Sequence, residues 1–229
     1  MGQALTDFRQ SLAIAQALIA LEATYPDPPS EAESLTVQGL RGGATVIMVA
    51  SFEDYLESMF AEHLARFDGN PPPIALASLP MRIQQLGTFT TLRCALRGPR
   101  FQDTTRESRL PLVYAAVERL ASGRIDPVAM SEMPASPSPE NVESLFRAVG
   151  LPKVFARVTQ QYEAIAGPVA KTFLKDKLRE VVATRHVVAH TGRALNVSRS
   201  KLTEWVDFLD VVAKLLDGEV DSLVTDVLR

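Results

Sequence analysis

The chain lacks features that several large classes of protein require. Its single cysteine, Cys94, excludes an intramolecular disulfide and a cysteine-rich zinc site. No run approaches the roughly 18 to 20 uninterrupted apolar residues of a membrane span. The N-terminal segment also has no basic stretch followed by an apolar core, which a secretory leader needs. We therefore expect a cytoplasmic protein that is neither secreted nor inserted in a membrane.

An excess of positive charge is also absent. The formal net charge of −3 argues against a general nucleic-acid coat protein, because such proteins carry many more lysines and arginines than acids. The charge is unevenly distributed along the chain. Residues 82–124 hold eight arginines, no lysine and three acids, for a net +5, whereas residues 1–65 carry nine acids and two arginines, for a net −7. Such asymmetry is typical of a binding surface for an anionic partner, although a solvated helix face gives the same pattern.

Apolar residues are plentiful and recur at helical spacing. They make up 46% of the 229 residues, which is enough for a real core and excludes disorder over most of the chain. No alternating run typical of a β-strand is found. The sequence therefore predicts one all-α domain over residues 1–229, a helical bundle of about six to seven helices. A proline-rich loop near residues 68–80 and an excursion near residues 126–137 are expected to interrupt it.

Local signals predict where these helices lie. A capping box at Ser30 and Glu33 precedes a helix that is expected to reach Phe67. Gly42 and Gly43 are candidate kink positions, although these two glycines and Gly39 fit close helix contact better. The last helix, from Ser200, keeps a 3-4 apolar spacing for nearly four heptads. Such an apolar stripe is typical of the core of a helical bundle, and a subunit interface is the second interpretation. The other expected helices cover residues 5–24, 111–121, 138–150, 152–166 and 169–190.

The most informative polar residues lie in one short segment. Two of the three histidines, His186 and His190, follow directly after Arg185. A helical wheel places Arg185 in the centre of the apolar stripe that begins at Leu178, where a guanidinium needs an anion or a water-filled cleft. His186 and His190, four residues apart, share a flank of the helix, and Gly192 fits the helix end just after them.

This segment and an earlier helix resemble a known family. Arg185 is followed after four residues by His190, the match lies late in an apolar helix, and a long helix comes after it. The stretch from Ser51 to Leu56 reads Ser-Phe-Glu-Asp-Tyr-Leu on the earlier helix. The combination resembles the HEPN superfamily of helical bundles, and more narrowly its RiboL-PSP-HEPN-like members. The resemblance covers the whole helical layout loosely, and its specific part is about thirty-five residues.

The resemblance implies a metal-independent endoribonuclease that needs no cofactor. Its active cleft would form where two motifs face each other across a homodimer, with RNA as the substrate. Arg185 would hold the scissile phosphate and His190 would handle the proton of the ribose 2′-hydroxyl, while His186 replaces the Asn or Asp common after the arginine. By analogy the protein would serve host defence or a toxin-antitoxin pair with a cognate antitoxin. The residue types suit the chemistry, because histidine titrates near neutrality and arginine stays charged.

Four further arginines are expected to bind the substrate. Arg97, Arg100, Arg106 and Arg109 belong to the positive segment, and forked guanidinium groups suit phosphate and unpaired bases. We expect them to border the cleft around Arg185. Their use in internal ion pairs is the competing explanation.

Three alternatives stay open at this point. His186 and His190 have the i, i+4 spacing of two zinc ligands, but no glutamate lies between them and no third ligand is near in the sequence. Arg185 could instead be a structural residue paired with a carboxylate such as Glu53 or Glu57. The third alternative is a non-catalytic RNA-binding or protein-binding helical module that uses the arginine cluster without cleavage.

Overall fold

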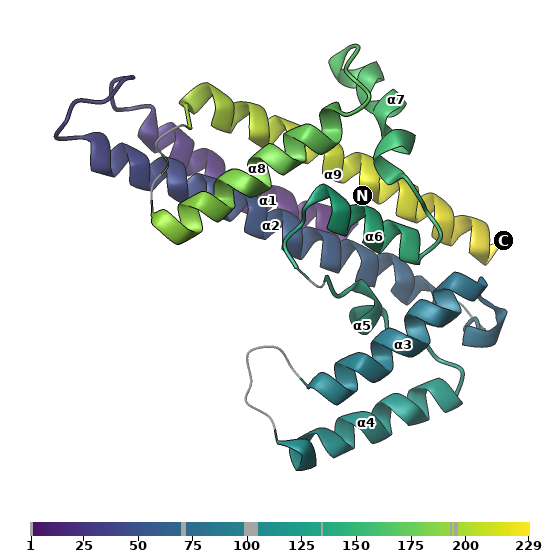
Figure 1. The fold of residues 1–229 in the computed structure, drawn as a ribbon. Coiled ribbons are helices and arrows are strands. Elements are labelled where there is room, and N and C mark those ends of the chain that lie inside the picture. The colour runs from purple at the N-terminus through teal and green to yellow at the C-terminus, as the bar shows by residue number, and fades with distance from the viewer. Residues whose placement is uncertain (1, 70–71, 99–104, 134, 193, 195–196) are drawn as a thin grey trace.

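The computed structural model describes residues 2–69, 72–98, 105–133, 135–192, 194 and 197–229. Over these residues the chain is all-α, with nine α-helices, one 3-10 turn and no strand (Figure 1). The helices are α1 (Gln3–Glu22), α2 (Ser34–Gly69), α3 (Met81–Arg97), α4 (Arg106–Ala121), α5 (Pro127–Ser131), α6 (Pro139–Ala148), α7 (Val154–Ala166), α8 (Phe173–Thr191) and α9 (Arg199–Leu228), and the 3-10 turn is η1 (Leu76–Ser78). The all-α class predicted from the sequence is confirmed.

The positive segment is more helical than expected. The sequence predicted one helix there, over residues 111–121, whereas the structure has α3 and a longer α4. The buried face of α3 includes Gly87, Thr90 and Thr91, so it lacks the apolar stripe by which a helix is detected. The side chain of Thr105 accepts a hydrogen bond from the Ser108 N–H, and this cap starts α4 well before Pro111.

The long helix α2 is the centre of the bundle. Helices α1, α5, α8 and α9 all pack along it, and its aromatic side chains Phe52, Tyr55 and Phe60 are buried. The Tyr55 hydroxyl donates a hydrogen bond of 2.8 Å to the carbonyl of Ala213 on α9, which ties the two longest helices together. α2 continues as one helix through the glycines at which a kink was considered.

The length and composition of α2 would also allow a membrane crossing, the one such helix among the residues that the structure describes. Its role as the central helix accounts for this composition, because a helix that packs against neighbours on several sides needs apolar residues on each of them.

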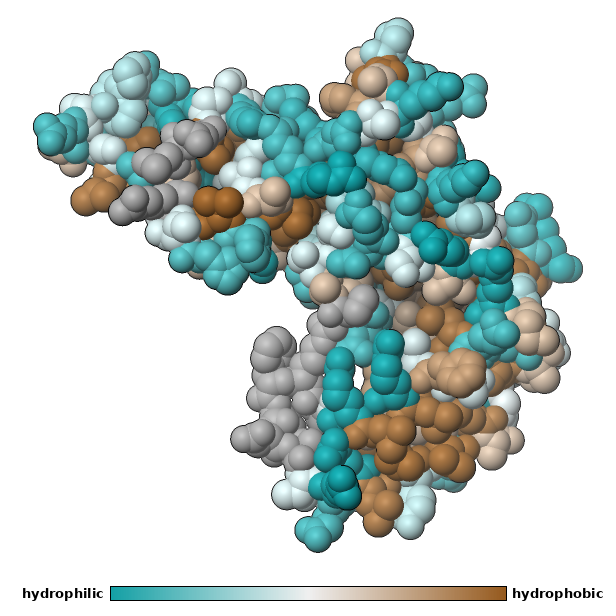
Figure 2. Space-filling model, viewed as in Figure 1, coloured by the Kyte–Doolittle hydropathy of each residue, from teal (hydrophilic) through white to brown (hydrophobic). Residues whose placement is uncertain are grey.

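Helices α3 and α4 form a hairpin that extends away from the bundle (Figure 1). Only Ala116 of α4 is buried. Leu110, Tyr114 and Val117 follow one another at heptad-like spacing on α4, and each is about half exposed or more. Apolar side chains gather on this outer part of the molecule in Figure 2. The hairpin thus carries both an excess of arginine and an uncovered apolar face.

Candidate functional site

Arg185 lies on the inward stripe of α8, as the helical wheel predicted. Leu178, Val181 and Val188 of this stripe are buried, whereas Arg185 is partly exposed. Its Nε atom is buried and has no hydrogen-bond partner. Leaving a charged N–H unsatisfied in a folded protein costs free energy, and such an exception calls for a functional or structural reason.

His186 and His190 form a pair on the exposed flank of the same helix. Both side chains are exposed, and their ring centroids are 4.3 Å apart with the ring planes at 62°. Helix α8 ends directly after them. Gly192 takes a left-handed conformation with φ 67°, and its N–H donates to the carbonyl of Val188 at 2.8 Å. The predicted helix end at Gly192 is confirmed.

Close packing holds this part of α8 against α2. A Cβ atom at Gly42 would lie 3.1 Å from Cγ1 of Val188 and 3.8 Å from Cβ of Ala194. Only a glycine lets the helix carrying Arg185 approach α2 at this distance without displacing a buried side chain. Gly42 therefore serves close helix contact, the role that the sequence favoured over a kink.

A buried ionic cluster anchors the chain that follows α8. Glu22 is fully buried, and it accepts hydrogen bonds from Arg41 at 2.8 Å and from Arg199 at 2.5 Å, both measured to the arginine Nε. Arg41 also donates to the carbonyl of Val197 at 3.0 Å. Burial favours a raised pKa for Glu22, but the hydrogen bonds from the two arginines outweigh it and the pKa is lowered. The cluster joins the end of α1, the start of α2 and the connection between α8 and α9.

The expected carboxylate partners do not pair with Arg185. Glu57 instead accepts a hydrogen bond of 2.8 Å from the backbone N–H of Met133. Arg185 forms no ion pair with Glu53, Glu57 or any other residue in the described part of the chain. The structure therefore does not support the interpretation of Arg185 as half of an internal ion pair.

The arginines expected to bind the substrate lie elsewhere. Arg97 pairs with Glu132, and the guanidinium of Arg109 donates to the carbonyl of Leu96 at 2.8 Å. Arg106 is exposed at the start of α4, and Arg100 lies outside the described residues. The α3–α4 hairpin is separate from the C-terminal end of α8 in Figure 1. Within one chain, Arg97, Arg106 and Arg109 therefore do not lie beside Arg185.

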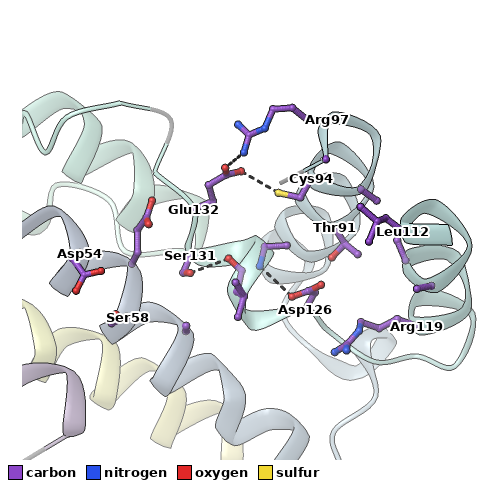
Figure 3. A pocket seen from close by; sticks show the side chains of 18 residues that line it. Asp54, Ser58, Thr91, Cys94, Arg97, Leu112, Arg119, Asp126, Ser131 and Glu132 are labelled. Atoms are coloured by element: carbon purple, nitrogen blue, oxygen red, sulfur yellow. Dashed lines mark hydrogen bonds and ion pairs between the residues drawn. The ribbon is translucent and has the colours of Figure 1, made fainter. Parts of the chain in front are cut away.

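The structure also contains a cavity that the sequence did not predict. It has a volume of about 660 Å³ and lies between α2 and the α3–α4 hairpin, with α5 along one side (Figure 3). Cys94 lines it, and its thiol donates a hydrogen bond of 3.0 Å to Glu132. Burial and this hydrogen bond raise the pKa of Cys94 to about 11, so the thiol is protonated near neutral pH. The walls of the cavity come from four helices between residues 54 and 132. Residues so far apart in the sequence form no short motif by which the cavity could be predicted.

Among the residues with described positions, no group of three or more His, Cys, Asp or Glu side chains could hold a metal ion. Comparisons with protein-family models, curated proteins and solved structures found no match to the chain.

Proposed function

We propose that this protein is a metal-independent endoribonuclease that acts as a homodimer, with Arg185 and His190 in its active site. The observation that carries the proposal is Arg185 itself. Its guanidinium has no carboxylate partner within the described part of the chain, its Nε is buried and unsatisfied, and two exposed histidines follow it within five residues on α8. A phosphate of RNA would supply the missing anion.

Each residue has a role in the reaction. His190 accepts the proton of a ribose 2′-hydroxyl as the 2′-oxygen bonds to the adjacent phosphorus. The bond from phosphorus to the 5′-oxygen then breaks and a 2′,3′-cyclic phosphate remains. The 5′-oxygen takes up a proton from solvent, and the protonated His190 returns its proton to solvent. Arg185 stabilises the negative charge that develops on the phosphate oxygens. The family that this sequence resembles has Asn or Asp directly after the arginine, at the position of His186. We assign His186 a role in orienting the RNA.

Incubation of the purified protein with total RNA in EDTA tests the proposal. We expect cleavage that leaves 2′,3′-cyclic phosphate ends, because the chemistry uses a histidine and an arginine. Arg185→Ala and His190→Ala should each reduce the cleavage rate by about 100-fold or more, with unchanged circular dichroism. His186→Asn should keep most of the activity.

Matched variants separate the site from its surroundings. Arg179 lies on the same helix but is exposed and paired with Glu140 and Asp176, so Arg179→Ala should cleave at the wild-type rate. Activity that survives in His190→Ala overturns the assignment. Activity that disappears in EDTA and returns with zinc would favour the metal-binding alternative.

The homodimer is tested by sedimentation. Two copies of α8 facing each other would place a second arginine and a second histidine pair in one cleft. We expect a mass of about twice the 25.0 kDa of the chain. A monomer at concentrations where the protein cleaves RNA would contradict a composite cleft.

A non-catalytic binding module is the second candidate. The uncovered apolar face of α4, with Leu110, Tyr114 and Val117, favours it because exposed apolar stripes on helices often bind partner helices. A wild-type protein that binds RNA or a protein partner but leaves RNA intact would support this function over cleavage.

A further inference from the structure

The cavity beside the α3–α4 hairpin has the size of a ligand site. Its volume of about 660 Å³ falls within the range of pockets that hold small organic molecules. Its walls are largely apolar and include Ala95 of α3, Ala116 of α4 and Val128 of α5. A molecule that enters it would therefore bury an aliphatic or aromatic body.

The charged groups around the cavity are unbalanced. Four carboxylates and two guanidinium groups line it, which gives a formal net charge of −2. Both guanidinium groups are already engaged. Arg97 pairs with Glu132, and Arg119 donates to the carbonyl of Ile125 at 2.9 Å. Little positive charge is left for an anionic ligand.

The carboxylates differ in how they are used. Asp126 caps α5 by accepting a hydrogen bond of 3.1 Å from the N–H of Ala129, and Glu57 accepts one of 2.8 Å from the N–H of Met133. Asp54 of α2 is exposed and makes no ion pair or side-chain hydrogen bond with the described residues. It is the carboxylate most available to a cationic group of a ligand.

A second, independent observation comes from Thr91. This residue lines the cavity and is only 2% exposed, and its hydroxyl has no hydrogen-bond partner. The neighbouring Thr90 instead donates to the carbonyl of Leu86 at 2.6 Å, the usual arrangement of a buried helical threonine. A polar hydrogen of a bound molecule would satisfy the Thr91 hydroxyl.

We propose that this cavity binds a small organic cation, a primary amine or guanidine carried on an apolar body. The apolar walls bury the body, and Asp54 pairs with the cationic group within the negative field of the cavity. The site is independent of the proposed ribonuclease centre, because it lies on α2, α3, α4 and α5 rather than on α8.

Three probes of equal length separate charge from hydrophobicity: hexylamine, hexanol and hexanoate. Cys94 is the only cysteine and lines the cavity, so its labelling by a neutral methanethiosulfonate reagent at pH 9 reports occupancy. We expect hexylamine to slow the labelling at the lowest concentration, hexanol to require more, and hexanoate to be the weakest.

Variants test the position of the ligand. Asp54→Asn should weaken hexylamine binding roughly threefold to fivefold, the size expected for one exposed ion pair, and leave hexanol unchanged. Asp207→Asn, an exposed acid on α9, is the control and should alter nothing. Ala115→Trp places a large ring in the cavity from the exposed helix α4, so it should abolish binding of all three probes.

Three results would overturn the proposal. The first is equal or better protection by hexanoate, the second is unchanged hexylamine binding in Asp54→Asn or Ala115→Trp, and the third is no protection by any probe at millimolar concentration. RNA cleavage by the same preparations decides the ribonuclease proposal separately.

Discussion

Val188 of α8 packs against the bare backbone of Gly42 on α2, where a Cβ atom would lie 3.1 Å from the Val188 Cγ1. Arg185 lies one helical turn before Val188 on the same stripe. The absence of a side chain at Gly42 therefore determines how closely α8, which carries Arg185, packs against the central helix α2.

This contact predicts opposite effects for two glycines of α2. A Cβ atom at Gly39 would have no neighbour within 4 Å, so Gly39→Ala should stabilise the protein by about 0.5 to 1 kcal/mol through helix propensity. Gly42→Ala gains the same propensity but presses on a buried valine, so it should be less stable than Gly39→Ala by about 1 kcal/mol or more. Urea denaturation of both variants measures the difference. Equal stability would show that α8 moves freely away from α2.

The buried cluster around Glu22 predicts a pH dependence of stability. Removing the carboxylate leaves Arg41 with Asp27 as its remaining ion pair and leaves Arg199 with backbone carbonyls alone. Glu22→Gln should therefore lower the free energy of unfolding at pH 7 by about 2 kcal/mol. The pKa of Glu22 is lowered from its ordinary value of 4.5. Its stabilising contribution is therefore complete above pH 4.5 and is lost as the pH falls through the folded-state pKa.

Denaturation between pH 7 and pH 3 measures this dependence. The wild type should lose stability over the acid part of the range more steeply than Glu22→Gln. Glu31→Gln, at an exposed position, serves as the control and should follow the wild type. Parallel curves for the wild type and Glu22→Gln would contradict the role of this carboxylate.

Cys94 should react slowly with thiol reagents. With its pKa raised to about 11, its thiolate fraction at pH 8 is about a hundredfold lower than that of an ordinary thiol, and its labelling rate should rise with pH through pH 10. Glu132→Gln removes the carboxylate that accepts the thiol hydrogen bond, so it should lower the pKa and speed the reaction. The pH profile of labelling for both proteins measures this. A variant profile identical to that of the wild type would exclude Glu132 as a cause.

The arginines of the hairpin should not contribute equally to RNA binding. Arg106 is exposed and makes no ion pair or side-chain hydrogen bond with the described residues, so Arg106→Gln should weaken binding and reduce the salt dependence by about 0.7 for a single-stranded RNA. Arg97 is already paired with Glu132, so Arg97→Gln should change the salt dependence less. Binding measured at several salt concentrations separates the two. An unchanged slope for Arg106→Gln would place the RNA-binding surface elsewhere.

The sequence determined the helical class and the local geometry of α8. Helical periodicity is a property of neighbouring residues, so it was sufficient to place Arg185 among buried valines and to end the helix at Gly192. It also predicted α9, from Ser200 where the helix begins at Arg199, because the apolar spacing there is regular.

Tertiary structure alone decided how the charged residues are used. The sequence could not show that Arg97 pairs with Glu132 while Arg185 has no carboxylate partner in the described part of the chain, because only the packing of distant helices sets these distances. Helix α3 escaped detection because glycine and threonine form much of its buried face. The cavity around Cys94 required residues from four helices to converge. Such convergence depends on long-range contacts, which local periodicity does not encode.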